Sequence, residues 1–210
     1  MARVHPVGSA ADLIYKLRVT PNPAVSTCEA ELAGFFRRRD KHERAGFQLY
    51  VAAVAAARDP WLYRTLGVPD TLDGRFDAIG LYVYLVVRRL TAEPEPGPGL
   101  AQAVFDAMFL DMDSNLREMG VGDLSVGKRN RAMWEAFHGR SAAYTAAWDD
   151  PAALAAALIR NVWRGAPPPA GAGPALERLA RAQAACLAGQ DIEAMRRGDI
   201  DFLPAREAAQ

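Results

Sequence analysis

FDAMFLDMDSNLREMGVGDLSVGKR, residues 105–129, is the stretch of sequence that decides the fold of this chain. Its apolar residues recur every three or four positions and share one arc of about 100°, the pattern of an amphipathic α-helix. The arc consists of Phe105, Met108, Phe109, Met112, Leu116 and Met119. Gly120 predicts the end of this helix, because glycine readily adopts the conformation that follows a helix C-terminus.

The same helical spacing recurs on both sides of this stretch. Further apolar stripes lie at residues 32–36, 47–54, 76–90, 126–137, 154–162 and 176–187. We expect the first to end at the charged run 37–41, and the one at 126 to be capped by Asp123 or Ser125 and stopped by Gly139. Asp150 followed by Pro151 predicts another helix start. With no alternating strand pattern, the sequence predicts an all-α fold, a single non-repeating helical domain of about eight helices.

Proline and glycine suggest how the chain is organised. We expect a loosely ordered N-terminal arm over residues 1–28, with one short helix near residues 10–18. A helical domain over 29–165 follows, then a Pro/Gly linker over 166–174. Residues 175–210 form a C-terminal helical tail that packs on the domain, with a helical turn at 191–197 and a segment at 202–204 that docks back.

Composition excludes several classes of protein. The formal net charge is zero, which argues against a dedicated nucleic-acid binder. The two cysteines, Cys28 and Cys186, are far apart and fit a reducing compartment better than a disulfide framework. The longest apolar run, residues 78–87, falls short of the roughly 20 residues that span a bilayer. Asp12 and Lys16 interrupt any signal-peptide pattern, so we expect a cytoplasmic protein, peripheral at most at the inner membrane.

Two chemical sites suggested by residues 105–129 fail on inspection. Gly122 to Lys128 has the spacing of a phosphate-binding loop, but a helix precedes it and Arg129 replaces the hydroxyl residue that would hold magnesium. The carboxylates of this helix resemble a metal site, but no Glu-x-x-His pair accompanies them. We therefore expect no metal, no cofactor and no catalytic residues, and an ion pair between Asp113 and Arg117 on the helix flank.

Two surfaces remain as candidates for protein binding. A methionine-rich helix face is either ordinary core or a groove for hydrophobic helices, and both interpretations stay open. The candidate protein-binding surface comprises Met108, Asp111, Met112, Asp113, Asn115, Arg117, Glu118, Gly120, Gly122, Asp123, Lys128 and Arg129. A basic patch is either a solvated helix end or a contact to anionic lipid or ribosomal RNA. It comprises Arg37, Arg38, Arg39, Lys41 and Arg44.

Several blocks in one order carry a resemblance to a known family. They are VPDTLDGRF at 68–76, DMDSNLREMGVGDLSVGKR at 111–129, AAARDPWLY at 55–63, FHGRSAAY at 137–144 and NVW at 161–163. Over residues 35–164 the chain resembles the ubiquinol–cytochrome c chaperone family, and in particular its bacterial members.

The resemblance implies an all-helical, non-enzymatic factor for assembly of respiratory complex III. Its expected client is newly made cytochrome b or another hydrophobic membrane protein, held together with a small partner protein near the ribosome and the membrane. The alternative is a small-ligand-binding protein or enzyme with an enclosed pocket near Tyr82, Trp134 and residues 111–123. An open apolar groove with charged rims would favour the chaperone, and a closed polar pocket the alternative.

Overall fold

The computed structural model describes residues 29–210, with side chains from residue 42 onward except those of residues 123 and 124. Within this range the chain consists of helices and loops without a strand, which confirms the all-α prediction. Three long helices come first: α2 (Glu29–Ala57), α4 (Leu72–Thr91) and α5 (Gly97–Glu118), with the short α3 (Pro60–Arg64) after α2. The others are α6 (Asp123–Ala147), α7 (Pro151–Val162), α8 (Ala172–Ala188), α9 (Ile192–Arg197) and α10 (Ala205–Ala208).

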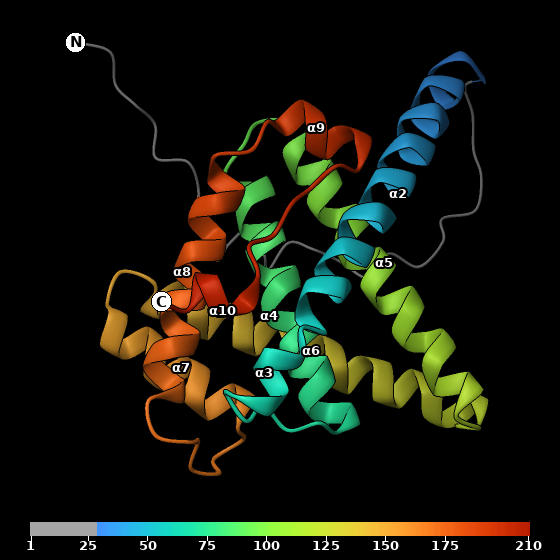
Figure 1. Cartoon of the computed structure of the whole chain (residues 1–210). Helices are drawn as coiled ribbons and strands as arrows, with labels where there is room; N and C mark the ends of the chain where they lie inside the picture. Colours follow the sequence, from blue (N-terminus) through green and yellow to red (C-terminus); the bar gives the residue numbers. More distant parts are fainter. Residues whose placement is uncertain (1–28) are drawn as a thin grey trace.

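Helix α4 lies at the centre of the molecule (Figure 1). It packs against α2 and α5 on one side, against α7 and α8 on the other, and against α6. Most of its residues are buried, including the run from Phe76 to Val87, as its apolar residues on several faces predict. Its N-terminus is capped by the Thr71 hydroxyl, which accepts a hydrogen bond from the Gly74 amide at 3.1 Å.

Helix α2 is longer than the sequence suggested. The prediction of two helices separated at residues 37–41 is wrong, because α2 runs without a break from Glu29 to Ala57. The charged run contains no glycine or proline, and arginine and lysine are good helix formers, so charge alone does not end the helix.

Helix α6 also continues past its predicted end at Gly139 and runs through Tyr144 to Ala147. Glycine inside a helix costs only about 1 kcal/mol, which the buried Phe137 and Tyr144 on either side offset. Neither Asp123 nor Ser125 is the N-cap, since that position belongs to Gly122. Ser141 lies inside α6 and is buried.

The C-terminal part of the chain packs on the helices that precede it. Helix α8 begins at Ala172, so its first turn falls in the stretch expected to be linker. It contacts α4 and α7, and α9 contacts α2. The ring of Phe202 meets Tyr82 edge to face, 5.4 Å between centroids, so residues 202–204 do dock back. The predicted N-terminal arm lies outside the described residues, and the division into arm, domain, linker and tail stays a prediction.

Candidate functional site: an open apolar groove

A groove lies between α2, α5 and α6, with a volume of about 950 Å³. Figure 1 shows α2 and α5 crossing on one side of the molecule and α6 running below them. The groove is lined by Glu43, Phe47, Ala103, Phe105, Asp106, Ala107, Phe109, Leu110, Asp113, Gly127, Asn130, Arg131 and Trp134. It is therefore built from residues that are distant in sequence and meet only in the folded chain.

The apolar lining of the groove is partly open to solvent. Phe47 on α2 is 53% exposed and Leu110 on α5 is 73% exposed, whereas Phe105, which also lines the groove, is fully buried. Single exposed apolar side chains are ordinary on protein surfaces, but two large ones in one concave apolar site indicate a place where something docks.

An aromatic cluster supports the wall formed by α6. The Trp134 indole stacks on the His138 ring one turn later, with 4.0 Å between centroids and 29° between planes. Phe105 contacts both Phe109, at 4.7 Å, and His138, at 5.5 Å, so rings from α5 and α6 interlock. The Trp134 Nε1 atom is buried and has no hydrogen-bond acceptor in the described structure. Such unpaired buried N–H groups are rare in folded proteins.

Charged and amide side chains form the rim. Asp113 accepts hydrogen bonds from Arg117 Nε at 2.6 Å and from Asn130 Nδ2 at 2.7 Å, which ties the end of α5 to the start of α6. The predicted Asp113–Arg117 ion pair is thus confirmed. Arg131 pairs with Glu135 at 3.0 Å on the solvent side. The site is an apolar strip between charged edges.

The wall between α2 and α5 is tightly packed. A β-carbon at Gly46 would lie 2.5 Å from that of Ala103 and 2.9 Å from the Val104 nitrogen, so only glycine allows this approach. One turn along, the Tyr50 hydroxyl donates to Asp111 Oδ2 at 2.6 Å. Burial raises the pKa of Tyr50 well above its ordinary value, and the hydrogen bond to Asp111 adds to the shift.

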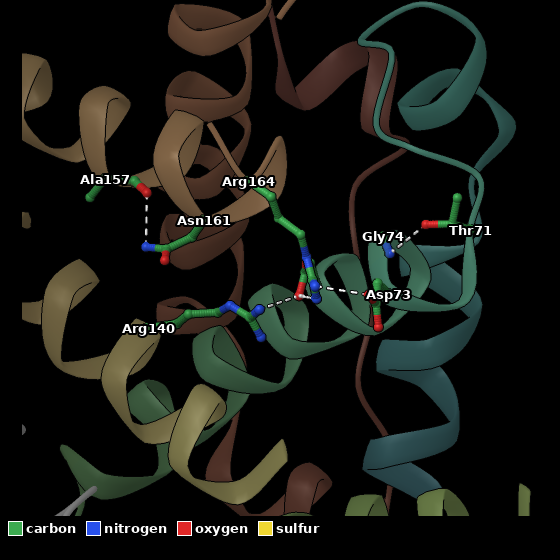
Figure 2. Close-up of polar contacts among 8 residues, drawn as sticks. Thr71, Asp73, Gly74, Arg140, Ala157, Asn161 and Arg164 are labelled. Carbon is green, nitrogen blue, oxygen red and sulfur yellow. Dashed lines mark hydrogen bonds and ion pairs between the residues drawn. The ribbon is translucent and has the colours of Figure 1, made fainter. Parts of the chain in front are cut away.

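A charged cluster holds the far end of α6 (Figure 2). The buried Asp77 carboxylate on α4 accepts from Arg140 Nη2 at 2.7 Å and from Arg164 Nε at 2.7 Å. Figure 2 shows Arg140 and Arg164 reaching inward from α6 and from the chain after α7, and Arg164 also contacts Asp73 at 2.9 Å. Burial raises the pKa of Asp77, while the hydrogen bond from Arg164 and the charges of both arginines act in the opposite direction.

The structure separates the residues of the predicted protein-binding surface. Met108 and Met112 are buried, so the core interpretation is correct for both. Asp113 lines the groove, and Asp111 is bound to Tyr50. The other residues lie at the α5–α6 corner outside the groove lining, and the side chain of Asp123 is outside the described set. The exposed ones are Asn115, Arg117, Glu118, Gly120, Gly122, Lys128 and Arg129.

Sequence reasoning missed the residues that open the groove. Leu110 lies off the predicted apolar arc, and a large apolar residue on the polar side of an amphipathic helix was the available signal. Phe47 was assigned to a buried stripe and is instead half exposed. No sequence pattern indicated the rim residues Glu43, Asn130 and Arg131, because only the fold brings them to the rim.

The structure tests three other sites suggested by the sequence around residues 111–128: a phosphate-binding loop, an enclosed pocket and a metal site. Gly127 and Lys128 lie inside α6, so the stretch with phosphate-loop spacing is helical and cannot wrap a phosphate. Tyr82 is buried against Phe202, whereas Trp134 lines the open groove, so the two do not enclose a common pocket. Among the described side chains, no three His, Cys, Asp or Glu residues are placed to share a metal ion.

The structure describes only one side chain of the predicted basic patch. Arg44 is exposed on α2, and the side chains of Arg37, Arg38, Arg39 and Lys41 lie outside the described set. No helix within residues 29–210 combines the length and apolar character needed to cross a bilayer.

Fold and groove together define an all-α protein with an open apolar groove between charged edges. A family model described as ubiquinol–cytochrome C chaperone matches residues 64–202. The chain belongs to the ubiquinol–cytochrome c chaperone family. This match confirms the resemblance found from sequence and extends it beyond Gly165 into the C-terminal helices.

Two relatives support this membership. The chain is 25% identical over 119 residues to ubiquinol–cytochrome-c reductase complex assembly factor 1 of Xenopus laevis, a match that spans 56% of this chain and 60% of that relative. It is also similar to the crystal structure of the Cbp3 homolog from Brucella abortus. That similarity has a TM-score of 0.72 and 35% identity, and covers 84% of this chain and 98% of the other.

Proposed function

We propose that this protein is a non-enzymatic chaperone for assembly of the ubiquinol–cytochrome c reductase complex, and that it shields a hydrophobic helix of cytochrome b in the α2–α5–α6 groove. The observation that carries the proposal is the open apolar groove with exposed Phe47 and Leu110. Membership of the chaperone family and the name of the Xenopus relative, a complex assembly factor, support a role in assembly of this complex. The choice of cytochrome b as the client is our proposal, made from the family resemblance.

The groove suits a helical client for physical reasons. Amphipathic or apolar helices dock in grooves by laying a stripe of side chains at i, i+3, i+4 and i+7 along an apolar floor. Fully burying an exposed Phe or Leu side chain stabilises a complex by about 1.5–3 kcal/mol each, which is enough for reversible holding. The charged edges remain in water and orient the client rather than add affinity.

The family resemblance is our reason for proposing further partners. A small partner protein and a peripheral position at the cytoplasmic face of the inner membrane complete the proposal. The exposed basic residues Lys128 and Arg129, beside the groove, would favour an anionic membrane surface.

Leu110→Asp tests the groove directly. Because Leu110 is 73% exposed, a carboxylate there leaves the fold intact but places a charge where an apolar helix would dock. In a host strain lacking the native gene, we expect this variant to lower haem b absorbance and ubiquinol oxidation. It should also co-purify at least about tenfold less cytochrome b, since a single lost apolar contact of this size is worth more than 1.4 kcal/mol.

Leu72→Asp is the matched control, since Leu72 is 57% exposed at the start of α4 and does not line the groove. We expect normal cytochrome b with this variant. Normal cytochrome b with Leu110→Asp and Phe47→Asp together would exclude the groove as the client site.

A further inference from the structure

A second hollow lies on a different face, between the C-terminal half of α4, the end of α8 and Trp148, the C-cap residue of α6. Its volume is about 440 Å³. It is lined by Leu85, Arg88, Arg89, Ala92, Trp148, Arg181, Ala184, Ala185 and Ala188, none of which lines the groove. Every charged residue of this lining is an arginine, so the pocket is cationic with an apolar floor.

Two of the three arginines are fixed by contacts around the pocket. Arg89 donates from Nε to the Leu187 carbonyl at 2.9 Å and from Nη2 to the Gln190 carbonyl at 3.0 Å, and pairs with Glu93. Arg181 pairs with Glu177 and donates from Nη2 to the Trp148 carbonyl at 2.7 Å. Their positions are set before any ligand arrives, which lowers the entropic cost of binding.

Arg88 differs from its neighbours. Its guanidinium carbon lies 4.2 Å from the centroid of the Trp148 ring, and that of Arg181 lies 5.6 Å from the same centroid. Within the described part of the chain no carboxylate pairs with Arg88. Stacking on the indole and a side-chain hydrogen bond with the Tyr84 hydroxyl hold the guanidinium group, and neither contact supplies a negative charge.

The positive charge of the pocket and the arrangement of its arginines indicate the kind of ligand that it would bind. Three guanidinium groups carry three positive charges, and Glu93 and Glu177 compensate two of them outside the lining. A phosphate monoester presents three terminal oxygens, and a phosphodiester presents two terminal and two bridging oxygens. In both, the oxygens are arranged as a tetrahedron and can face several planar forks at once, whereas a carboxylate presents only two oxygens in one plane. The alanines and Leu85 offer an apolar surface to the carbon side of an ester.

We propose that the Arg88–Trp148–Arg181 pocket binds a phosphate ester. The ester could belong to a small soluble molecule or to the headgroup of a phospholipid, and the chemistry recognised is the same. This site does not depend on the groove or on the client assigned to it.

Binding is tested on the full chain with two probes, sn-glycerol 3-phosphate in calorimetric titration and flotation with phosphatidylcholine vesicles with or without phosphatidylglycerol. We expect Arg88→Gln to weaken saturable binding of one probe about tenfold or more, since it removes a charge-assisted hydrogen-bonding group. Arg64→Gln, which removes the same charge from an exposed site on α3, should leave binding unchanged.

The two probes identify the source of the phosphate. Arg88-dependent binding of glycerol phosphate indicates a small ester, and Arg88-dependent flotation only with phosphatidylglycerol indicates a lipid headgroup. Absence of saturable binding of both probes, or equal losses in Arg88→Gln and Arg64→Gln, would overturn the proposal.

A spectroscopic measurement on the unsubstituted chain covers the case in which Arg88→Gln does not fold. The bound probe should shift the indole N–H resonance of Trp148 and leave those of Trp61, Trp134 and Trp163 in place, because only Trp148 lines this pocket. Equal shifts at all four indoles, or none, would also contradict the pocket.

Discussion

At the scale of single residues, Asp77 links more of the structure than any residue of the groove. Its buried carboxylate joins α4 to α6 through Arg140 and to the chain after α7 through Arg164. A buried charge of this kind contributes little net stability while it is paired, but it is costly once a partner is removed.

Arg140→Ala should therefore lower the free energy of unfolding by about 3 kcal/mol, because Asp77 stays buried with one guanidinium fewer. The measurement is urea unfolding followed by circular dichroism. Arg75→Ala is the control, since Arg75 and Asp70 form an ion pair with both side chains more than half exposed, and little change is expected. Equal stability of the two variants would show that Asp77 does not need Arg140.

Single residues of α5 show how far the helical spacing of apolar residues predicts burial. Met108 and Met112 lie on a regular apolar arc, and both are core, as such an arc usually indicates. Leu110 lies off the arc and is more exposed than Phe47, the other exposed large apolar residue of the groove. Periodicity therefore predicted the burial of Met108 and Met112, but it is not a complete guide, because Phe47 fits a helical stripe and is exposed all the same.

At the scale of elements, the α2–α5 crossing and the α6 helix place glycine in opposite situations. A β-carbon at Gly46 would meet backbone atoms of the facing helix, whereas one at Gly139 would meet nothing within 4 Å. The same substitution should therefore have opposite effects at the two positions.

Gly46→Ala should destabilise the fold by about 1–3 kcal/mol, because α2 and α5 must move apart to admit the methyl group. Gly139→Ala should instead stabilise it by about 0.5–1 kcal/mol, since alanine favours the helix and its methyl group reaches solvent. Thermal unfolding of both variants checks the pair. A loss of stability in Gly139→Ala would contradict the open surroundings of that position.

Prediction of the elements succeeded where the signal was local. Asp150 caps α7, accepting from the amides of Ala152 and Ala153, and Gly120 follows α5 with a φ of 78°. Prediction failed where a weak local stop was outweighed by packing, as at Gly139 and at the charged run within α2. Local signals of about 1 kcal/mol lose to the burial of large side chains on both sides.

At the scale of the whole molecule, buried tyrosines make the free energy of unfolding depend on pH in the alkaline range. Burial raises the pKa of Tyr50, Tyr82 and Tyr144 above the ordinary value of 10.0. The folded protein therefore keeps these protons at a pH where the unfolded chain, with ordinary tyrosines, releases them. Stability from this source is fully present below about pH 10 and falls as the pH rises further.

Tyr144→Phe tests this dependence. The Tyr144 hydroxyl is buried with no hydrogen-bond partner in the described structure, so its removal should cost little at neutral pH. Above about pH 10 the variant should lose stability less steeply with pH than the unsubstituted chain, because one buried proton no longer contributes. Urea unfolding midpoints across this range provide the comparison, and identical slopes would refute the assignment.

The groove itself could not be predicted from sequence, for a reason that belongs to this scale. Phe47, Leu110 and Trp134 come from three helices, and their meeting depends on how α2, α5 and α6 cross. Helix periodicity specifies the buried face of each helix but not the crossing angles, which side-chain packing selects among a few alternatives. The fold class was therefore predictable, and the concave surface was not.

The cluster at Asp77 also matters for the groove, because it anchors α6 at a point remote from the groove wall. Arg140 lies about 20 Å along the helix axis from Gly127 on that wall. Nearer the groove, the Asp113–Asn130 hydrogen bond and the contact of Phe105 with His138 hold α6 to α5. The concave surface is therefore formed by the packed fold itself, so little conformational entropy is lost when a molecule binds there.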